Sequence, residues 1–181
     1  VLEGVWGEVL NAGPGAWARK AVDAGAEIIA LTLRSAAPDL GNTGPAEAVE
    51  KVKEVLEAVD VPLIVYGCGI AAKDNEVLVA VADATAGERL ALGLCEDKNY
   101  RTLVATCMAN GHIAIGNSPI DINLAKQMNI LMSDMGLSGD RILMDPTTGA
   151  LGYGLEYSYS VMERLRVAAL QGDSMTAVPM V

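Results

Sequence analysis

The stretch Ile142–Gly154, ILMDPTTGALGYG, decides the fold of this chain. It opens on three apolar residues, as expected of a parallel strand that is covered on both faces. Pro146 cannot donate a hydrogen bond to a sheet ladder and biases Asp145 away from helical geometry, so we expect the strand to end here. A carboxylate and two threonine hydroxyls therefore follow the carboxyl end of a strand, where barrels and open α/β sheets carry functional groups. The same residue types also cap helices, which is a purely structural alternative.

A helix is expected after this loop, and Gly172 ends it. Its apolar stripe consists of Leu155, Met162, Leu165 and Ala169. Three tyrosines, Tyr153, Tyr157 and Tyr159, are placed on the same helix. The spacing of Tyr153 and Tyr157 puts them on one face, where they can contact a ligand or a partner subunit, or pack within the protein.

Short apolar strands alternate with amphipathic helices through the whole chain. The predicted strands are residues 28–33, 63–66, 90–94, 113–115, 142–144 and 175–181. One predicted helix begins near Ala16, before the first strand, and the helices between the strands begin near Pro45, Asp74, Asn99 and Ser118. At the last of these, SPID at residues 118–121 is typical of a capping box with a proline at the first helical position. Strand starts roughly 25–35 residues apart correspond to one crossover unit, so we expect an all-parallel α/β fold.

Two nucleotide-binding motifs are missing from this pattern. No G-x-G-x-x-G follows the first strand and no G-x-x-x-x-G-K-[ST] occurs, so neither supports an open nucleotide-binding sheet. We therefore expect a (β/α)8 TIM barrel that is incomplete at one or both ends in this chain. It forms a single domain over residues 1–181 with about six of the eight βα units, and residues 1–14 are poorly defined.

Composition excludes several classes of protein. The net charge is −10, with 13 basic and 23 acidic residues, which disfavours nucleic acid and anionic membranes as partners. No apolar run approaches the roughly 18 residues of a membrane span, and nothing resembles a signal peptide. The three cysteines, Cys68, Cys95 and Cys107, show no C-x-x-C spacing, and His112 is the one histidine. We therefore expect no Cys/His metal site, no iron-sulfur cluster in this chain, and a reducing, cytoplasmic location.

The groups expected at the strand ends include Tyr66, Cys68, Glu96, Asn117 and Asp145. No lysine stands there, which disfavours Schiff-base chemistry. The histidine lies at the start of its strand and is expected to be structural, so no base is available to make Cys68 a nucleophile. Six glycines, Gly67, Gly69, Gly116, Gly149, Gly152 and Gly154, give a neutral rim that favours a broad, flat ligand, unless each serves only a tight turn.

The run at residues 144–164, MDPTTGALGYGLEYSYSVMER, is more specific than a generic barrel unit. Other pieces with it are WARKAV at 17–22, VYGCG at 65–69, ALGL at 91–94, EDKNY at 96–100 and ALQGD at 169–173. With these pieces the chain resembles the small (delta) subunit of the corrinoid iron-sulfur protein of the carbon monoxide dehydrogenase/acetyl-CoA synthase system. That system is also called the acetyl-CoA decarbonylase/synthase complex. The resemblance covers the chain from Trp17 onward, whereas residues 1–14 match less well.

The resemblance implies a TIM barrel similar to that of the pterin-dependent methyltransferases. It implies a heterodimer with a large subunit that carries the iron-sulfur cluster and holds much of a cobalamin-type corrinoid, while the barrel mouth covers the other side of the corrin. The complex accepts a methyl group from methyl-tetrahydropterin through a methyltransferase and passes it to the nickel site of acetyl-CoA synthase, or runs in reverse. The cobalt makes the bonds, and the protein supplies placement and shielding.

The first hypothesis is a methyl-carrier subunit without stand-alone chemistry. The residues expected at the corrinoid-facing mouth, where they hydrogen-bond corrin side-chain amides, are Asn117, Ser118, Asp145, Thr147, Thr148 and Gly149. No residue is assigned a catalytic or metal-binding role. The alternative is a stand-alone pterin-binding methyltransferase of the dihydropteroate-synthase-like barrel class, in which Asp145 and Asn117 hydrogen-bond the pterin ring. A third hypothesis is a structural barrel that docks partner proteins.

Overall fold

The computed structural model describes residues 2–7 and 9–181. Five parallel strands form one sheet in the order β1-β2-β3-β4-β5, with each strand beside the next along the chain. The strands are β1 Ile29–Thr32, β2 Leu63–Tyr66, β3 Ala91–Cys95, β4 Ile113–Asn117 and β5 Ile142–Asp145. Unbroken sequential order in a parallel sheet is the connectivity of a (β/α) barrel and differs from the reversing order of a doubly wound sheet.

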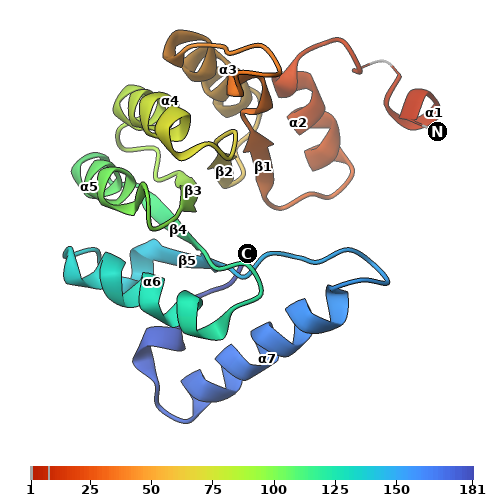
Figure 1. Ribbon diagram of the computed structural model, residues 1–181. Coiled ribbons are helices and arrows are strands. Elements are labelled where there is room, and N and C mark those ends of the chain that lie inside the picture. Colours follow the sequence, from red (N-terminus) through yellow and green to blue (C-terminus); the bar gives the residue numbers. More distant parts are fainter. Residues whose placement is uncertain (1, 8) are drawn as a thin grey trace.

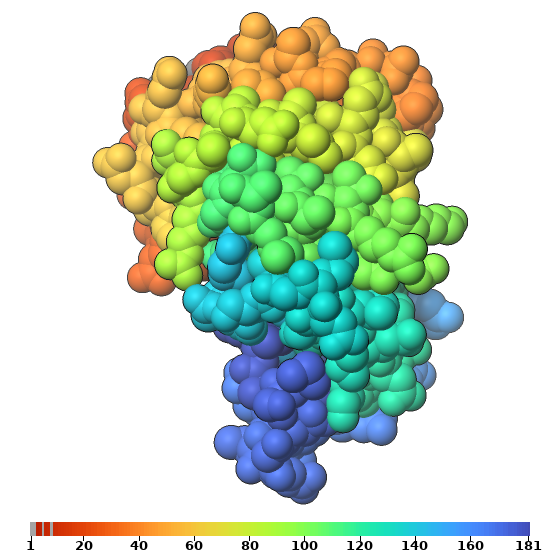
Figure 2. Space-filling model, turned by 90° about the vertical axis from the view of Figure 1, so that its left-hand side faces the viewer, coloured from red at the N-terminus to blue at the C-terminus, as the bar shows by residue number. Residues whose placement is uncertain are grey.

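Helices connect the strands and cover the outer face of the sheet (Figure 1). They are α1 Leu2–Trp6, α2 Pro14–Asp23, α3 Pro45–Ala58, α4 Ala71–Ala84, α5 Tyr100–Asn110, α6 Ile122–Asp134 and α7 Leu155–Leu170. Short 3-10 turns are η1 Arg34–Ala36, η2 Gly139–Arg141 and η3 Ser174–Thr176. Figure 2 shows the consecutive units as consecutive bands of colour, so neighbours in sequence are also neighbours in space. None of the helices in the described ranges has the length and apolar content that crossing a bilayer requires.

The two faces of the sheet belong to two separate apolar clusters. Leu63 and Val65 of β2 belong to the large cluster under the helices, whereas Ile64 packs with Ala91 and Ile115 in a small cluster on the inner face. This division follows from the period of two along a strand. The inner cluster also includes the partly buried side chains Tyr66, Leu94, Ile113 and Leu143. Inner-face positions near the carboxyl ends of the strands therefore point toward the barrel mouth.

The last predicted strand, residues 175–181, is mostly wrong. Its first residues belong to η3, where the Asp173 carboxylate accepts a hydrogen bond from Met175 N at 3.2 Å. Of these residues only Met180 pairs with β5, through a parallel bridge to Met144. Met144 N donates to Pro179 O at 2.8 Å, and Val181 N donates to Met144 O at 2.9 Å. The chain thus joins the sheet at its last residues, beside β5.

The predicted start of α6 is also wrong. Ser118 does not cap the helix, which begins at Ile122 with Asp121 as its N-cap. The Asp121 carboxylate accepts hydrogen bonds from Asn123 N at 2.8 Å and Leu124 N at 3.0 Å. The preceding residues are held against the end of β5 instead, since Ser118 N donates to Asp145 O at 3.0 Å and Ile120 N donates to Pro146 O at 2.9 Å.

At the starts of α4 and α5, the residues predicted as helix caps, Asp74 and Asn99, bond to the preceding loops and do not cap the helix. Asp74 lies inside α4, which begins at Ala71, and its carboxylate reaches back to the loop after β2. Asn99 precedes α5 as predicted, but its side chain makes no cap hydrogen bond. It accepts from Glu96 N at 2.7 Å and donates to Leu94 O at 3.1 Å, which fixes the loop after β3.

The apolar stripe of α7 is shifted from the predicted one. The buried positions are Ser158, Val161 and Leu165, whereas Leu155 is exposed. Tyr153 lies in the loop before α7, and the side chains of Tyr153, Tyr157 and Tyr159 are 85%, 59% and 64% exposed. Core packing of the three tyrosines, one of the alternatives, is therefore excluded.

Candidate functional site

Polar side chains gather where the inner face of the sheet meets the carboxyl ends of the strands. Tyr66 ends β2, Glu96 follows β3, and Asn117 and Asp145 are paired in register at the ends of β4 and β5. Each stands two residues beyond an apolar residue of the inner-face cluster: Tyr66 after Ile64, Glu96 after Leu94, Asn117 after Ile115 and Asp145 after Leu143. The sheet curvature brings these four ends toward one another.

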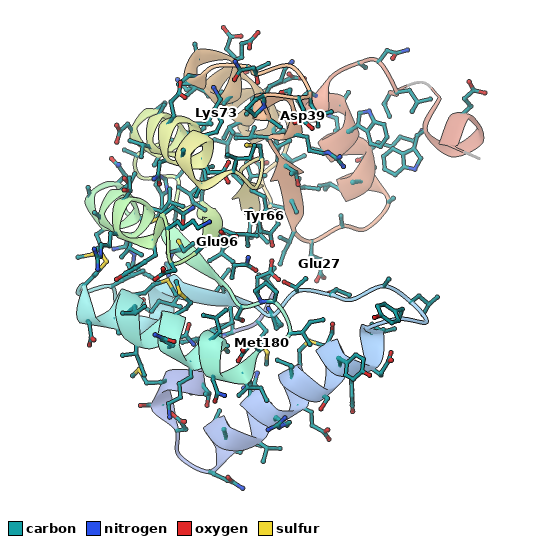
Figure 3. The ribbon with its side chains drawn as sticks, viewed as in Figure 1. Glu27, Asp39, Tyr66, Lys73, Glu96 and Met180 are labelled. Carbon is teal, nitrogen blue, oxygen red and sulfur yellow. The ribbon has the colours of Figure 1, made fainter. Side chains whose placement is uncertain are left out.

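The ends of β2, β3 and β5 line a cavity of about 300 Å³, here called the mouth pocket. Tyr66 and Glu96, two side chains of its lining, are labelled in Figure 3. Its lining includes Thr32, Tyr66, Cys68, Leu94, Glu96 and Asp145, with the glycines of the loop after β2. A larger cavity of about 680 Å³ lies at the free edge of β1, between α2 and Trp6. Its lining is apolar apart from Asn11 and has no titratable side chain, so the mouth pocket is the candidate functional site despite its smaller volume.

A chain of hydrogen bonds fixes the polar groups beside the mouth pocket. Asn117 Nδ2 donates to Glu96 Oε1 at 3.1 Å, and Thr147 Oγ1 donates to Asn117 Oδ1 at 3.4 Å. Thr147 N donates to Asp145 Oδ1 at 2.8 Å. The ends of three strands and the loop after β5 are therefore linked by hydrogen bonds, and two of the linked residues, Glu96 and Asp145, line the mouth pocket.

The pKa of Tyr66 is raised by its position in the mouth pocket. Burial first, and then the charge and hydrogen bonding of Asp145, raise the pKa of Tyr66 to about 12. Burial likewise raises the pKa of Cys68. Both side chains are therefore protonated at neutral pH, which agrees with the expectation that Cys68 is no nucleophile.

Asp74 organises the loop after β2 from beneath. It is 3% exposed, and its carboxylate accepts from Cys68 N at 2.7 Å and Gly69 N at 3.0 Å. A Cβ at Gly67 would collide with this carboxylate, so the close approach requires glycine. The Gly67-Cys68-Gly69 motif of the sequence thus serves the shape of the mouth pocket, with the Cys68 side chain on its wall.

Ser158 holds the loop of residues 147–154, here called the mouth loop. Its buried Oγ accepts from Gly149 N at 2.8 Å and donates to Thr147 O at 2.9 Å. Thr147 has a positive φ of 63°, and a Cβ at Gly149 would lie 2.5 Å from the backbone of Gly154. Ser158 is not among the residues predicted from the sequence. The one signal for it is a serine at the spacing of the buried face of α7, which is otherwise apolar.

The structure places the six predicted mouth residues in three settings. Asn117, Asp145 and Thr147 lie together and hydrogen-bond one another. Ser118 is 1% exposed with its Oγ 3.4 Å from Asp145 O, so it supports the strand end from behind. In the mouth loop, Thr148 is exposed and Gly149 packs against Gly154.

The mouth is more acidic than the predicted neutral rim. Asp74, Glu96 and Asp145 line the mouth pocket, and no lysine or arginine lines it among the described residues. His112 lies away from the mouth, where its Nδ1 accepts from Leu90 N at 3.2 Å and its Nε2 lies 3.0 Å from Ala82 O, as expected of a structural histidine. Within residues 2–7 and 9–181, no group of three or more histidine, cysteine and acidic side chains is arranged to hold a metal ion.

Comparison with protein families gives one match over nearly the whole chain. Residues 5–181 match the family model described as CO dehydrogenase/acetyl-CoA synthase delta subunit. The chain is 41% identical over 165 residues to the acetyl-CoA decarbonylase/synthase complex subunit delta of Methanopyrus kandleri, covering 90% of this chain and 41% of that protein. It is 42% identical over 176 residues to the subunit delta of Methanosarcina mazei, covering 96% and 40%. The chain thus spans about two fifths of the length of these relatives.

Comparison with solved structures supports the barrel architecture. The chain aligns with a TIM barrel, Yersinia pestis DHPS with a pterine-sulfa conjugate, at a TM-score of 0.58 and 19% identity. The alignment covers 92% of this chain and 64% of that one, so the five parallel units form part of a barrel, as predicted. At this identity the likeness concerns the fold alone.

Proposed function

The chain belongs to the CO dehydrogenase/acetyl-CoA synthase delta subunit family, and from this premise we propose that it provides the corrinoid-facing barrel mouth of a methyl-carrier subunit. In this role the protein takes part in moving a methyl group between methyl-tetrahydropterin and the nickel site of acetyl-CoA synthase. Its proposed partners are a large corrinoid-carrying iron-sulfur subunit, a methyltransferase and acetyl-CoA synthase. A bound corrinoid would supply the cobalt that accepts and releases the methyl group.

The residues at the mouth suit a corrinoid lying across it. Asn117 and Thr147 present amide and hydroxyl groups beside the mouth pocket, and Thr148 is exposed next to them. These groups pair with carboxamide side chains, which both donate and accept hydrogen bonds. A cavity of about 300 Å³ is too small for a whole macrocycle, so the ring would rest on the rim with a side arm inside.

The observation that carries this proposal is the linked set Glu96–Asn117–Thr147 at the strand ends of a chain from this family. The set holds side chains in place before any ligand arrives, so the protein orients the corrinoid and keeps water from the face it covers. It offers no pair of groups arranged as nucleophile and base, which agrees with a carrier that leaves bond-making to the cobalt.

The test uses the full-length protein with its large corrinoid-carrying subunit. The double variant Thr147→Ala, Thr148→Ala removes two rim hydroxyls, and we expect corrinoid retention and the rate of methyl transfer to fall about tenfold, the effect of losing one or two hydrogen bonds. Thr102→Ala, an exposed threonine on α5, is the matched control. Retention and transfer equal to those of the control would contradict the assigned rim.

A second candidate function is direct binding of methyl-tetrahydropterin by this barrel. It is favoured by the size and polarity of the mouth pocket, in which Asp145, with Asn117 beside it, can hydrogen-bond a pterin ring. The solved barrel with a similar fold was determined with a pterine-sulfa conjugate. Titration of the isolated full-length protein with methyl-tetrahydropterin distinguishes the two, because the carrier role predicts no tight pterin binding in the absence of the other subunits.

A further inference from the structure

The mouth pocket has an unusual balance of hydrogen-bonding groups. Three carboxylates, Asp74, Glu96 and Asp145, line it, and no cationic side chain of the described residues does. The two oxygens of Asp74 already accept from Cys68 N and Gly69 N, which leaves Glu96 and Asp145 as the carboxylates that can accept from a ligand. Glu96 Oε1 accepts a hydrogen bond from Asn117, and Asp145 accepts from Thr147 N at Oδ1 and from the side chain of Tyr66. Glu96 Oε2 accepts no hydrogen bond from the described residues and is left for a ligand. An ionised carboxylate is acceptor-only, so the pocket presents acceptors to whatever enters it.

The charge of the pocket sets a second constraint. Negative groups without a cation among them repel a carboxylate or a phosphate, and the repulsion is strong where water is partly excluded. The pKa of Tyr66 is raised mainly by burial, and the charge of Asp145 raises it further by disfavouring a second negative charge on the phenol. A ligand group that enters the pocket must therefore be uncharged or cationic and must carry N–H or O–H donors.

The size and shape of the mouth pocket further restrict which ligand group can enter it. About 300 Å³ accommodates a side arm or the edge of one ring system, and Tyr66, Leu94 and Gly67 provide largely apolar wall area around the acceptors. Asn117 is fixed by its bond to Glu96, and its Oδ1 accepts from Thr147, so the amide orientation is set. An amide-type edge, with NH₂ next to a carbonyl, fits this pocket because its N–H groups can donate to the carboxylates, while the apolar wall contacts the rest of the group.

We propose that the mouth pocket binds an uncharged amide-type edge whose N–H groups donate to Glu96 and Asp145, and that it rejects a carboxylate in the same position. This inference rests on the proposed function, in which the group is a carboxamide arm of the corrinoid. The amino-carbonyl edge of a pterin has the same chemistry and is the other source. Glu96 is thus a specificity-determining residue of the mouth.

The experiment measures equilibrium binding to the full-length protein at neutral pH. The probes are cobinamide, a corrinoid with carboxamide arms; the same corrinoid with its arms hydrolysed to carboxylates; and methyl-tetrahydropterin. We expect cobinamide to bind at least about tenfold more tightly than its carboxylate form, as like charges a few ångströms apart require. Glu96→Gln keeps the shape and removes one charge, so we expect it to tighten binding of the carboxylate form about threefold to tenfold.

Asp97→Asn is the matched control, because Asp97 is the next carboxylate in sequence but is exposed and does not line the pocket. Both variants must keep the wild-type circular dichroism spectrum. Equal binding of the two corrinoids, or equal effects of Glu96→Gln and Asp97→Asn, would overturn the inference and leave the proposed function standing.

A failure of the proposed function would give a different pattern of binding among the three probes. If neither corrinoid binds but methyl-tetrahydropterin does, and Glu96→Gln weakens it at least about threefold, the pocket chemistry is right and the ligand is the pterin. If that pterin binding is insensitive to Glu96→Gln, or if no probe binds, the inference is overturned as well.

Discussion

Replacing Ser158 by alanine removes the two hydrogen bonds that hold the mouth loop to α7. Ser158 Oγ accepts from Gly149 N at 2.8 Å and donates to Thr147 O at 2.9 Å, and the side chain is 1% exposed. The variant leaves the partly buried amide of Gly149 and the partly buried carbonyl of Thr147 without this partner. A net hydrogen bond contributes about 1 kcal/mol, and a buried polar group left unpaired costs on the order of 1–3 kcal/mol. We therefore expect the free energy of unfolding to fall by about 2 kcal/mol.

The assay combines chemical denaturation with hydrogen exchange on the full-length protein. A loss of about 2 kcal/mol corresponds to a melting temperature lower by about 4–8 °C for a domain of this size. If the loop opens locally, the amides of residues 147–154 should exchange about 30-fold faster while those of β2 and β3 stay protected. Ser160→Ala, two residues along α7 and less buried, is the matched control. Equal stability and equal loop exchange in the two variants would refute the role given to Ser158.

Three further changes test other parts of the account. Asp121→Ala removes the N-cap of α6, because the Asp121 carboxylate accepts from Asn123 N and Leu124 N, and should lower the free energy of unfolding by about 1 kcal/mol in chemical denaturation. Ser118→Ala should leave the start of the helix unaffected. A larger loss of stability for Ser118→Ala than for Asp121→Ala would mean that Ser118 caps the helix after all. Gly67→Ala forces a Cβ against the Asp74 carboxylate and should destabilise the protein by about 1–3 kcal/mol; a neutral effect would contradict the close packing. The pKa of Tyr66 is raised from 10.0 to about 12 in the folded state, so its contribution to stability is complete below pH 10 and is lost as the pH rises toward 12; in an absorbance titration Tyr66→Phe should remove one tyrosine that ionises near pH 12, and an unchanged titration would contradict the assignment.

The strands were predictable because parallel strands covered on both faces appear in the sequence as short apolar runs. The predicted strand at residues 63–66 matches β2, and the predicted barrel class is confirmed by the sheet order and the structural comparison. The last predicted strand failed since an apolar composition at residues 175–181 does not reveal that Asp173 folds the first residues into a turn.

Helix starts were less predictable because a capping residue has alternative partners. Asp74, Asn99 and Ser118 are all residue types that cap helices, yet each side chain bonds to a strand-end loop or backbone instead. Their partners lie on the far side of a βα turn, or in a different unit of the barrel. The sequence identifies the capping potential, and tertiary contacts decide where it is used.

The candidate site was partly predictable for a related reason. Asn117, Asp145 and Thr147 follow from their position at strand ends, since parallel strands end at one edge. The pocket formed by Tyr66, Glu96 and Asp145 depends on the curvature of the sheet and on the irregular register of β3, which no local pattern reveals. Ser158 acts on Thr147 from 11 residues away along the chain and could be inferred only after the loop was traced.

The most direct test of the central claim is the visible spectrum of the corrinoid when the full-length protein is mixed with its large corrinoid-carrying subunit, beside a titration of the protein alone with methyl-tetrahydropterin. The barrel mouth proposed here predicts a stable complex, a changed corrinoid spectrum, and no tight pterin binding by the protein alone. An unchanged spectrum together with tight pterin binding would contradict the carrier role and would make the barrel a pterin-binding protein in its own right.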